Sequence, residues 1–170
     1  AVKFSKSIFE EFSFSEKSVL DVGCSVGAAS WFALNKGAKR FLVSDIDGAH
    51  LDNAANVLSY FGASKVDSAP IKVASDVPCY GDSEFDICLC LHVFEHTEDP
   101  LGLSRAMWKA LKSGGALVYT YYFAPIAGGI NTTAGRDNRD ETLEYLRSVG
   151  SHSKKYDLDP YSIIYKSQNG

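Results

Sequence analysis

Two histidines and a glutamate form the most reactive group of side chains in this sequence. His92, Glu95 and His96 directly follow the apolar run 85–91. Histidine is the side chain best suited to accept a proton near neutral pH. The segment therefore predicts a general base, with His96 as the first candidate, His92 as the second and Glu95 between them. The alternative is that both histidines only hydrogen-bond the backbone where the strand ends.

Residues 92–96 also spell H-x-x-E-H, a pattern found in zinc proteases. Such a site needs a full helix and a third ligand, whereas this segment follows a predicted strand. The cysteines give no zinc pattern either, because no two of them have C-x-x-C spacing. We therefore expect no resident metal ion. The four cysteines are Cys24, Cys79, Cys88 and Cys90.

The stretch 19–27 has the residues of a ligand-binding loop. Its apolar start predicts a strand, and Gly23 and Gly27 lead into helix-compatible residues. A strand that turns through glycines into a helix lets a ligand approach the backbone and the helix N-terminus. Ser25 stands where a dinucleotide-binding G-x-G-x-x-G loop has its middle glycine. A ligand with a ribose and no phosphate fits this loop better than a dinucleotide.

Predicted strands and helices alternate along the chain, and these elements must hold the glycine loop and the histidine segment in place. It predicts an α/β fold: a doubly wound, Rossmann-like and mostly parallel sheet with helices on both faces and an antiparallel C-terminal hairpin. Ligands of such sheets bind at the carboxyl ends of the strands, where Gly23, Asp45, Asp76 and His92 fall. The expected strands are 19–22, 41–45, 71–74, 85–91, 116–121, 152–158 and 161–166, and the expected helices are 3–12, 27–36, 47–62, 97–111 and 139–149.

Composition indicates one ordinary globular domain over residues 1–170, with a short helical segment at 1–17 before a core at 18–170. The net charge of −4 and the scattered Lys and Arg residues argue against an extended nucleic-acid surface. The weakly polar stretch 116–130 is too short and too broken to span a membrane. Scattered cysteines suit a reducing compartment, so we expect a cytoplasmic protein.

Four segments in register, 19–27, 43–47, 85–96 and 111–118, resemble the class I S-adenosylmethionine-dependent methyltransferases. The resemblance implies S-adenosyl-L-methionine as cofactor, S-adenosyl-L-homocysteine as product, and a small-molecule acceptor methylated by in-line displacement on oxygen or, second, on nitrogen. It implies these cofactor contacts: Asp21, Gly23, Cys24 and Gly27 at the methionine end, Asp45 at the ribose, Ile46, Asp76 and Val77 at the adenine, and Leu91 beneath the cofactor. Ser25 departs from the glycine that the family often has.

Other functions are compatible with the same residues. The segment 85–96 resembles that of the ubiquinone-biosynthesis O-methyltransferases, in which an E-x-x-E-H sequence binds a divalent ion, but His92 replaces the first glutamate. A non-catalytic methyltransferase-like subunit or scaffold is one alternative. An oxidoreductase with a nicotinamide cofactor is a weaker one, because the third glycine of its loop is missing.

Overall fold

The computed structural model describes residues 13–73, 76–122, 139–149, 152–154 and 162–166. These residues form one sheet with the strand order β3-β2-β1-β4-β5-β7-β6, in which the strands from β3 to β5 are parallel. This is the α/β Rossmann-like fold that the sequence predicts. The strands are β1 (Ser18–Val22), β2 (Arg40–Asp45), β3 (Lys65–Pro70), β4 (Phe85–Cys90), β5 (Leu111–Tyr122), β6 (His152–Lys154) and β7 (Ser162–Lys166); the helices are α2 (Ala28–Asn35), α3 (Gly48–Tyr60), the 3-10 helix η1 (Phe94–His96), α4 (Pro100–Ala110) and α6 (Arg139–Val149).

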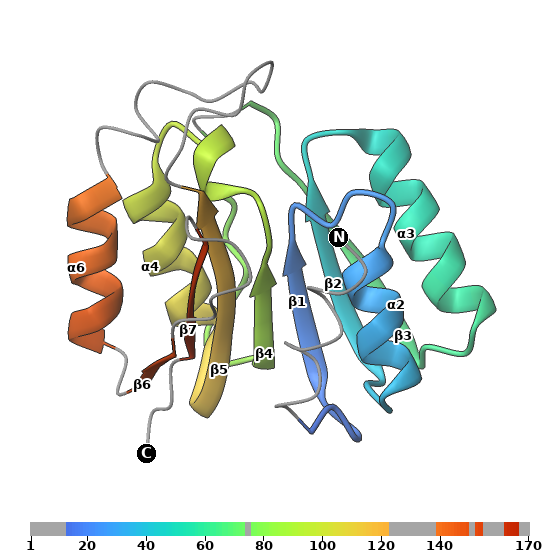
Figure 1. Ribbon diagram of the computed structural model, residues 1–170. Helices are drawn as coiled ribbons and strands as arrows, with labels where there is room; N and C mark the ends of the chain where they lie inside the picture. The colour runs from blue at the N-terminus through green and yellow to red at the C-terminus, as the bar shows by residue number, and fades with distance from the viewer. Residues whose placement is uncertain (1–12, 74–75, 123–138, 150–151, 155–161, 167–170) are drawn as a thin grey trace.

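The strands divide their buried side chains between two hydrophobic cores because successive residues of a strand point to opposite faces. Val19 and Leu89 belong to the core that α2 and α3 cover. Leu20 belongs to the core that α4 and α6 cover, together with Cys88 and Cys90. Figure 1 shows the two helix pairs on opposite sides of the sheet. Both cysteines are fully buried.

Local sequence explains where the helices begin. Gly27 precedes α2 with a φ of 80°, and a Cβ at this position would lie 3.0 Å from Cα of Ala54 on α3. Glycine therefore allows the two helices to pack closely. Asp47 caps α3 by accepting a hydrogen bond of 2.8 Å from the N–H of Ala49. Asp99 caps α4 in the same way, through the N–H of Gly102 at 2.7 Å.

The predicted position of the third strand, 71–74, is wrong, because β3 occupies Lys65–Pro70 instead. β3 lies at the edge of the sheet and most of its residues are exposed, so it lacks the apolar run that reveals a buried strand. Beyond β3, the N–H of Asp76 donates to the carbonyl of Val73 at 2.9 Å. Asp76 consequently lies six residues after the last residue of β3 and not at a strand end.

At the C-terminal side of the sheet, β7 pairs with β5 and β6 pairs with β7, both antiparallel. The leading helix expected at 3–12, the loop 124–137 and the turn expected at Asp159 and Pro160 lie outside the described residues. In the part of the chain that is described, no helix is long and apolar enough to cross a membrane.

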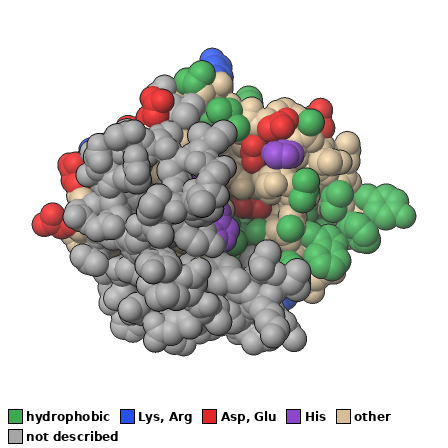
Figure 2. All heavy atoms as spheres, turned by 45° about the horizontal axis from the view of Figure 1, so that its top comes forward, with side chains coloured by type: hydrophobic (Ala, Val, Ile, Leu, Met, Phe, Trp, Pro, Cys, Tyr) green, Lys and Arg blue, Asp and Glu red, His purple; other side chains and the backbone are tan. Residues whose placement is uncertain are grey.

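Exposed aromatic side chains gather on the surface over α2 and α3, where Figure 2 shows a patch of hydrophobic side chains. Trp31 lies edge to face with Phe61, with ring centroids 6.4 Å apart, and Phe61 does the same with Tyr60 at 5.1 Å. Tyr60 ends α3, whereas Asp45 precedes the start of that helix. A helix of 13 residues is about 20 Å long, so Tyr60 lies at the opposite end of α3 from Asp45.

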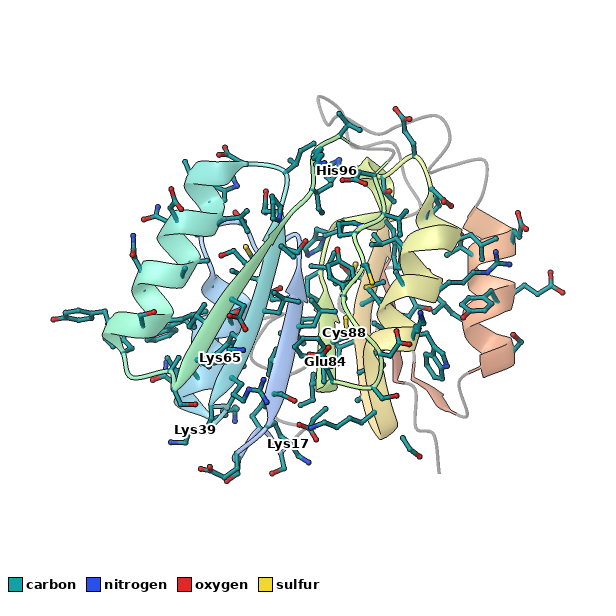
Figure 3. All side chains as sticks on the ribbon, turned by 180° about the vertical axis from the view of Figure 1, so that it is seen from behind. Lys17, Lys39, Lys65, Glu84, Cys88 and His96 are labelled. Atoms are coloured by element: carbon teal, nitrogen blue, oxygen red, sulfur yellow. The ribbon has the colours of Figure 1, made fainter. Side chains whose placement is uncertain are left out.

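A charged network ties together the amino ends of β1, β4 and β5. The carboxylate of Asp86 accepts hydrogen bonds from the backbone N–H and Oγ of Ser18, at 2.9 and 2.7 Å, and from Nζ of Lys112 at 2.9 Å. Burial alone would raise the pKa of Asp86, but these Ser18 and Lys112 contacts outweigh it and hold the pKa well below its usual range. Lys17 and Glu84 mark this edge in Figure 3, opposite His96.

Replacing Asp86 tests this network. Asp86→Asn removes the charge that Ser18 and Lys112 bind, and we expect a loss of about 1.5–3 kcal/mol in unfolding free energy at pH 7. A carboxyl with a lowered pKa stabilises the fold above about pH 4 and less at lower pH, so the deficit should shrink between about pH 4 and 2. Urea unfolding at several pH values measures both effects. The control Asp82→Asn, which breaks an exposed pair with Lys109, should change stability by less than about 0.5 kcal/mol.

Candidate functional site

The glycine loop is held against β2 by its backbone. The N–H groups of Gly23 and Cys24 both donate to the carbonyl of Ser44, at 2.7 and 3.0 Å. Gly23 has a φ of 68°, and a Cβ at this position would collide with the side chain of Val93. Glycine is required here for its conformation and because the loop after β4 packs against its backbone. The loop and the histidine segment are therefore in direct contact.

Asp21 is a buried carboxyl on β1, directly below this loop. Its carboxylate accepts a hydrogen bond of 2.6 Å from Oγ of Ser30, on α2. Burial raises the pKa of Asp21 to about 6; the hydrogen bonds with Ser30 oppose this shift and the charge of Asp45 adds to it. Asp21 therefore carries a charge at pH 7 in an environment that disfavours it. A cationic ligand group placed nearby would compensate that charge.

The carboxylate of Asp45 connects the end of β2 with the glycine loop. Its Oδ2 accepts from the N–H of Ser25 at 2.8 Å, and its Oδ1 accepts from the N–H of Asp47 at 2.9 Å. Nδ1 of His50, in the first turn of α3, lies 3.4 Å from the same Oδ1. The structure thus places Asp45 beside the loop, as the sequence predicts, and gives it contacts that the sequence does not reveal.

Ser25 and Ile46 flank this carboxylate. Ser25 has a φ of 49°, the left-handed conformation that a glycine adopts without strain. The hydrogen bond from the N–H of Ser25 to Asp45 offsets the strain of this conformation. Serine can therefore adopt here the backbone conformation that a glycine would have. Ile46 is 58% exposed. A large apolar side chain in water beside a carboxylate provides a surface on which a flat ring can pack.

The remaining predicted cofactor residues differ in their surroundings. Cys24 is buried, and burial, followed by the charges of Asp21 and Asp45, raises the pKa of its thiol well above the usual value. The thiol is therefore protonated and unreactive at neutral pH. Leu91 is half-buried and packs against the core under α2 and α3. Asp76 and Val77 are half-buried in the segment beyond β3, where Oδ2 of Asp76 accepts from the N–H of Lys72 at 3.2 Å.

His92 directly follows β4 in a strained conformation, with a φ of 62°. Its N–H donates to Oγ1 of Thr120, on the neighbouring strand β5, at 2.8 Å. Burial, and then the nearby His96, lowers the pKa of His92 below its usual value, so its imidazole is neutral at pH 7. His96 ends η1 and is exposed. Glu95 lies on η1 between them, and its side chain is outside the described part of the structure.

These groups meet at the carboxyl edge of the parallel strands. Figure 3 shows His96 at that edge, and Lys17, Lys39 and Lys65 at the opposite one. The described residues contain no group of three His, Cys, Asp or Glu side chains that could hold a metal ion.

Sequence reasoning missed several residues that hold the site together. Ser30 and Thr120 support Asp21 and His92 from other elements, and no local pattern connects them. Val93 is an ordinary apolar residue until the fold brings it to Gly23. His50 had a usable signal: it stands three residues after the cap residue Asp47, a spacing at which helical side chains are neighbours.

Comparison with known proteins gives this site its context. The family profile described as "Methyltransferase domain" matches residues 20–119. The ubiquinone biosynthesis O-methyltransferase of Xanthomonas campestris pv. campestris is 35% identical over 147 residues, which make up 85% of this chain and 58% of that protein. The chain spans about half the length of the curated relatives it matches.

Two solved structures share the fold. An S-adenosylmethionine-dependent methyltransferase from Mesorhizobium loti superposes with a TM-score of 0.71 and 18% identity, over 99% of this chain and 98% of its own. A [4+2]-cyclase superposes with a TM-score of 0.68 and 21% identity, over 89% of this chain and 58% of its own. At these identities the likeness shows the fold alone.

The fold is a Rossmann-like α/β domain with Gly23, Asp45 and His92 at the carboxyl ends of neighbouring parallel strands. The family match over residues 20–119 makes the class definite: this chain belongs to the class I S-adenosylmethionine-dependent methyltransferases. The methyl donor of that family, S-adenosylmethionine, carries a ribose, an adenine and a cationic amino-acid end. The residues present fit these three parts, because Asp45 offers a carboxylate, Ile46 an exposed apolar surface and Asp21 a buried negative charge.

The raised pKa of Asp21 gives a test that needs no ligand. A carboxyl with a raised pKa favours the fold only when protonated, so the unfolding free energy should fall as pH rises from about 4 to 6. Asp21→Asn should remove this slope and be more stable than wild type at pH 8 by on the order of 1–3 kcal/mol. Urea unfolding across this range measures it. The exposed control Asp52→Asn should keep the wild-type slope; the same slope in Asp21→Asn would contradict the assignment.

Proposed function

We propose that this chain transfers a methyl group from S-adenosylmethionine to an oxygen of a small-molecule acceptor. The observation that carries the proposal is the convergence at one sheet edge of the glycine loop, Asp45 and the segment 92–96, in a chain of this family. Oxygen is the preferred acceptor because the matched relatives are named O-methyltransferases. When bound, S-adenosylmethionine supplies a methyl group already activated on a sulfonium.

In this proposal the residues of the edge divide the work of holding the cofactor. Asp45 accepts hydrogen bonds from the ribose hydroxyls, and Ile46, Asp76 and Val77 surround the adenine. Gly23, Cys24 and Gly27 bring backbone close to the amino-acid end. Asp21 provides negative charge beneath that end, and Leu91 supports the cofactor from the end of β4. Each role is supported by the position of the residue at or beside this edge.

An acceptor hydroxyl must lose a proton as its oxygen gains a methyl group, and we assign that proton to His96, with His92 second. His96 is exposed at the edge, where an acceptor has access. His92 is neutral at pH 7 and is therefore also able to accept a proton. Glu95 lies between the two histidines in the sequence. In this proposal it orients the imidazole that acts as base or stabilises its protonated form. A nearby general base contributes about 10²–10⁴-fold to a rate.

We further propose that residues 18–170 form one folding unit closed by the antiparallel β6–β7 pair, with a small molecule as the partner of the site. The pairing of β7 with β5 supports the first statement. The free thiols of Cys24, Cys79, Cys88 and Cys90 fit a reducing, cytoplasmic setting.

Cofactor binding tests the role of Asp45. Asp45→Ala removes a charged acceptor, and hydrogen bonds to charged groups are worth about 1.5–3 kcal/mol each. Affinity for S-adenosylhomocysteine, measured by calorimetry, should therefore fall about 100-fold. The control Asp67→Ala, on exposed β3, should bind as wild type does. Calorimetry that shows no binding by wild type, with Asp45→Ala behaving in the same way, would favour a methyltransferase-like scaffold instead. Binding by wild type that Asp45→Ala leaves unchanged would remove Asp45 from the cofactor site.

Turnover tests the base. With a panel of small hydroxylated acceptors, release of S-adenosylhomocysteine by His96→Ala should be about 10²–10⁴-fold slower than wild type. The affinity for S-adenosylhomocysteine should stay within about twofold, because the imidazole acts on the acceptor. Unchanged turnover would remove His96 from the mechanism, and His92→Ala would then be the variant to measure.

A further inference from the structure

The number of acceptor positions on Asp45 limits how a ribose can bind. A carboxylate has about four lone-pair positions for hydrogen bonds. Ser25 and Asp47 fill two of them through backbone N–H groups at 2.8 and 2.9 Å, and Nδ1 of His50 lies against Oδ1 at 3.4 Å. One position on Oδ2 is then left. A ribose diol that binds through both hydroxyls needs two.

One of the three contacts must therefore give way, and the geometry identifies it. The N–H groups of Ser25 and Asp47 belong to the glycine loop and to the start of α3, so neither leaves without moving the backbone. The His50 side chain is 39% exposed, turns about two torsions, and makes the longest contact. We propose that His50 occupies the second ribose position of Asp45 when the cofactor is absent, and that the ribose displaces it.

A second carboxylate also holds His50 in this position. Nε2 of His50 lies 4.0 Å from Oδ2 of Asp47, so the ring stands between two carboxylates. Because these contacts are partly exposed, they change an affinity by no more than about fivefold. The ribose therefore replaces a weak contact, and an enzyme without the His50 side chain should bind a ribose more tightly.

Adenosine is the probe that isolates this effect, because it carries the ribose but no amino-acid end to respond to Asp21. His50→Ala removes the side chain that the ribose must displace, and we expect this variant to bind adenosine ~3- to 5-fold more tightly than wild type. Calorimetry or a thermal-shift titration at one pH measures both affinities.

A second ligand checks the count of acceptor positions. 2′-Deoxyadenosine has one hydroxyl fewer, so the position left on Oδ2 is enough for it, and wild type and His50→Ala should bind it equally. Asp52→Asn, on the exposed side of α3, should bind adenosine as wild type does. Adenosine binding by His50→Ala that is equal to or weaker than that of wild type overturns the proposal.

This inference rests on the proposed role of Asp45, and the same titrations separate the two. Adenosine binding that is unchanged in Asp45→Ala means that the ribose contact itself is wrong. Binding that is lost in Asp45→Ala but insensitive to His50 substitutions means that only the displacement is wrong.

Discussion

The carboxylate of Asp45 is the contact on which the candidate site depends. Asp45 is the last residue of β2. Its carboxylate binds the N–H of Ser25 in the glycine loop, the N–H of Asp47 at the start of α3, and the side chain of His50. A short turn has no core of its own, so its shape must come from hydrogen bonds to a fixed neighbour. The strand end provides that neighbour, because β2 pairs on both sides within the sheet.

The two edges of the sheet use polar groups in opposite ways. At the amino edge, Asp86 satisfies its charge with Ser18 and Lys112, and the network joins three strands. At the carboxyl edge, Asp21 is buried with a hydroxyl as partner, and its pKa rises to about 6. A network whose charges are paired stabilises a fold, whereas an unpaired buried charge costs free energy. The buried charge of Asp21 therefore lowers the stability of the fold at the carboxyl edge. A cationic ligand group bound beside Asp21 would compensate this cost.

Backbone strain gathers at the same edge. Ser25 and His92 both have positive φ angles, and each is held by a hydrogen bond from its N–H, to Asp45 and to Thr120. Val93 packs against Gly23 and joins the two strained turns. Strained residues persist only where their surroundings fix them, and they concentrate at functional sites. Through this contact the glycine loop packs directly against the segment that carries both histidines.

Local chemistry in the sequence was enough for the fold class, the buried strands and the position of Gly23, Asp45 and His92 at strand ends, because apolar runs and glycines act over a few positions. It failed for β3, whose exposed edge residues carry no apolar pattern. It also could not find Ser30, Thr120 or Val93, since their roles exist only after distant segments pack. Tertiary structure alone decided the charge state of Asp21 and the partners of Asp45, because burial and hydrogen-bond geometry are properties of the folded chain.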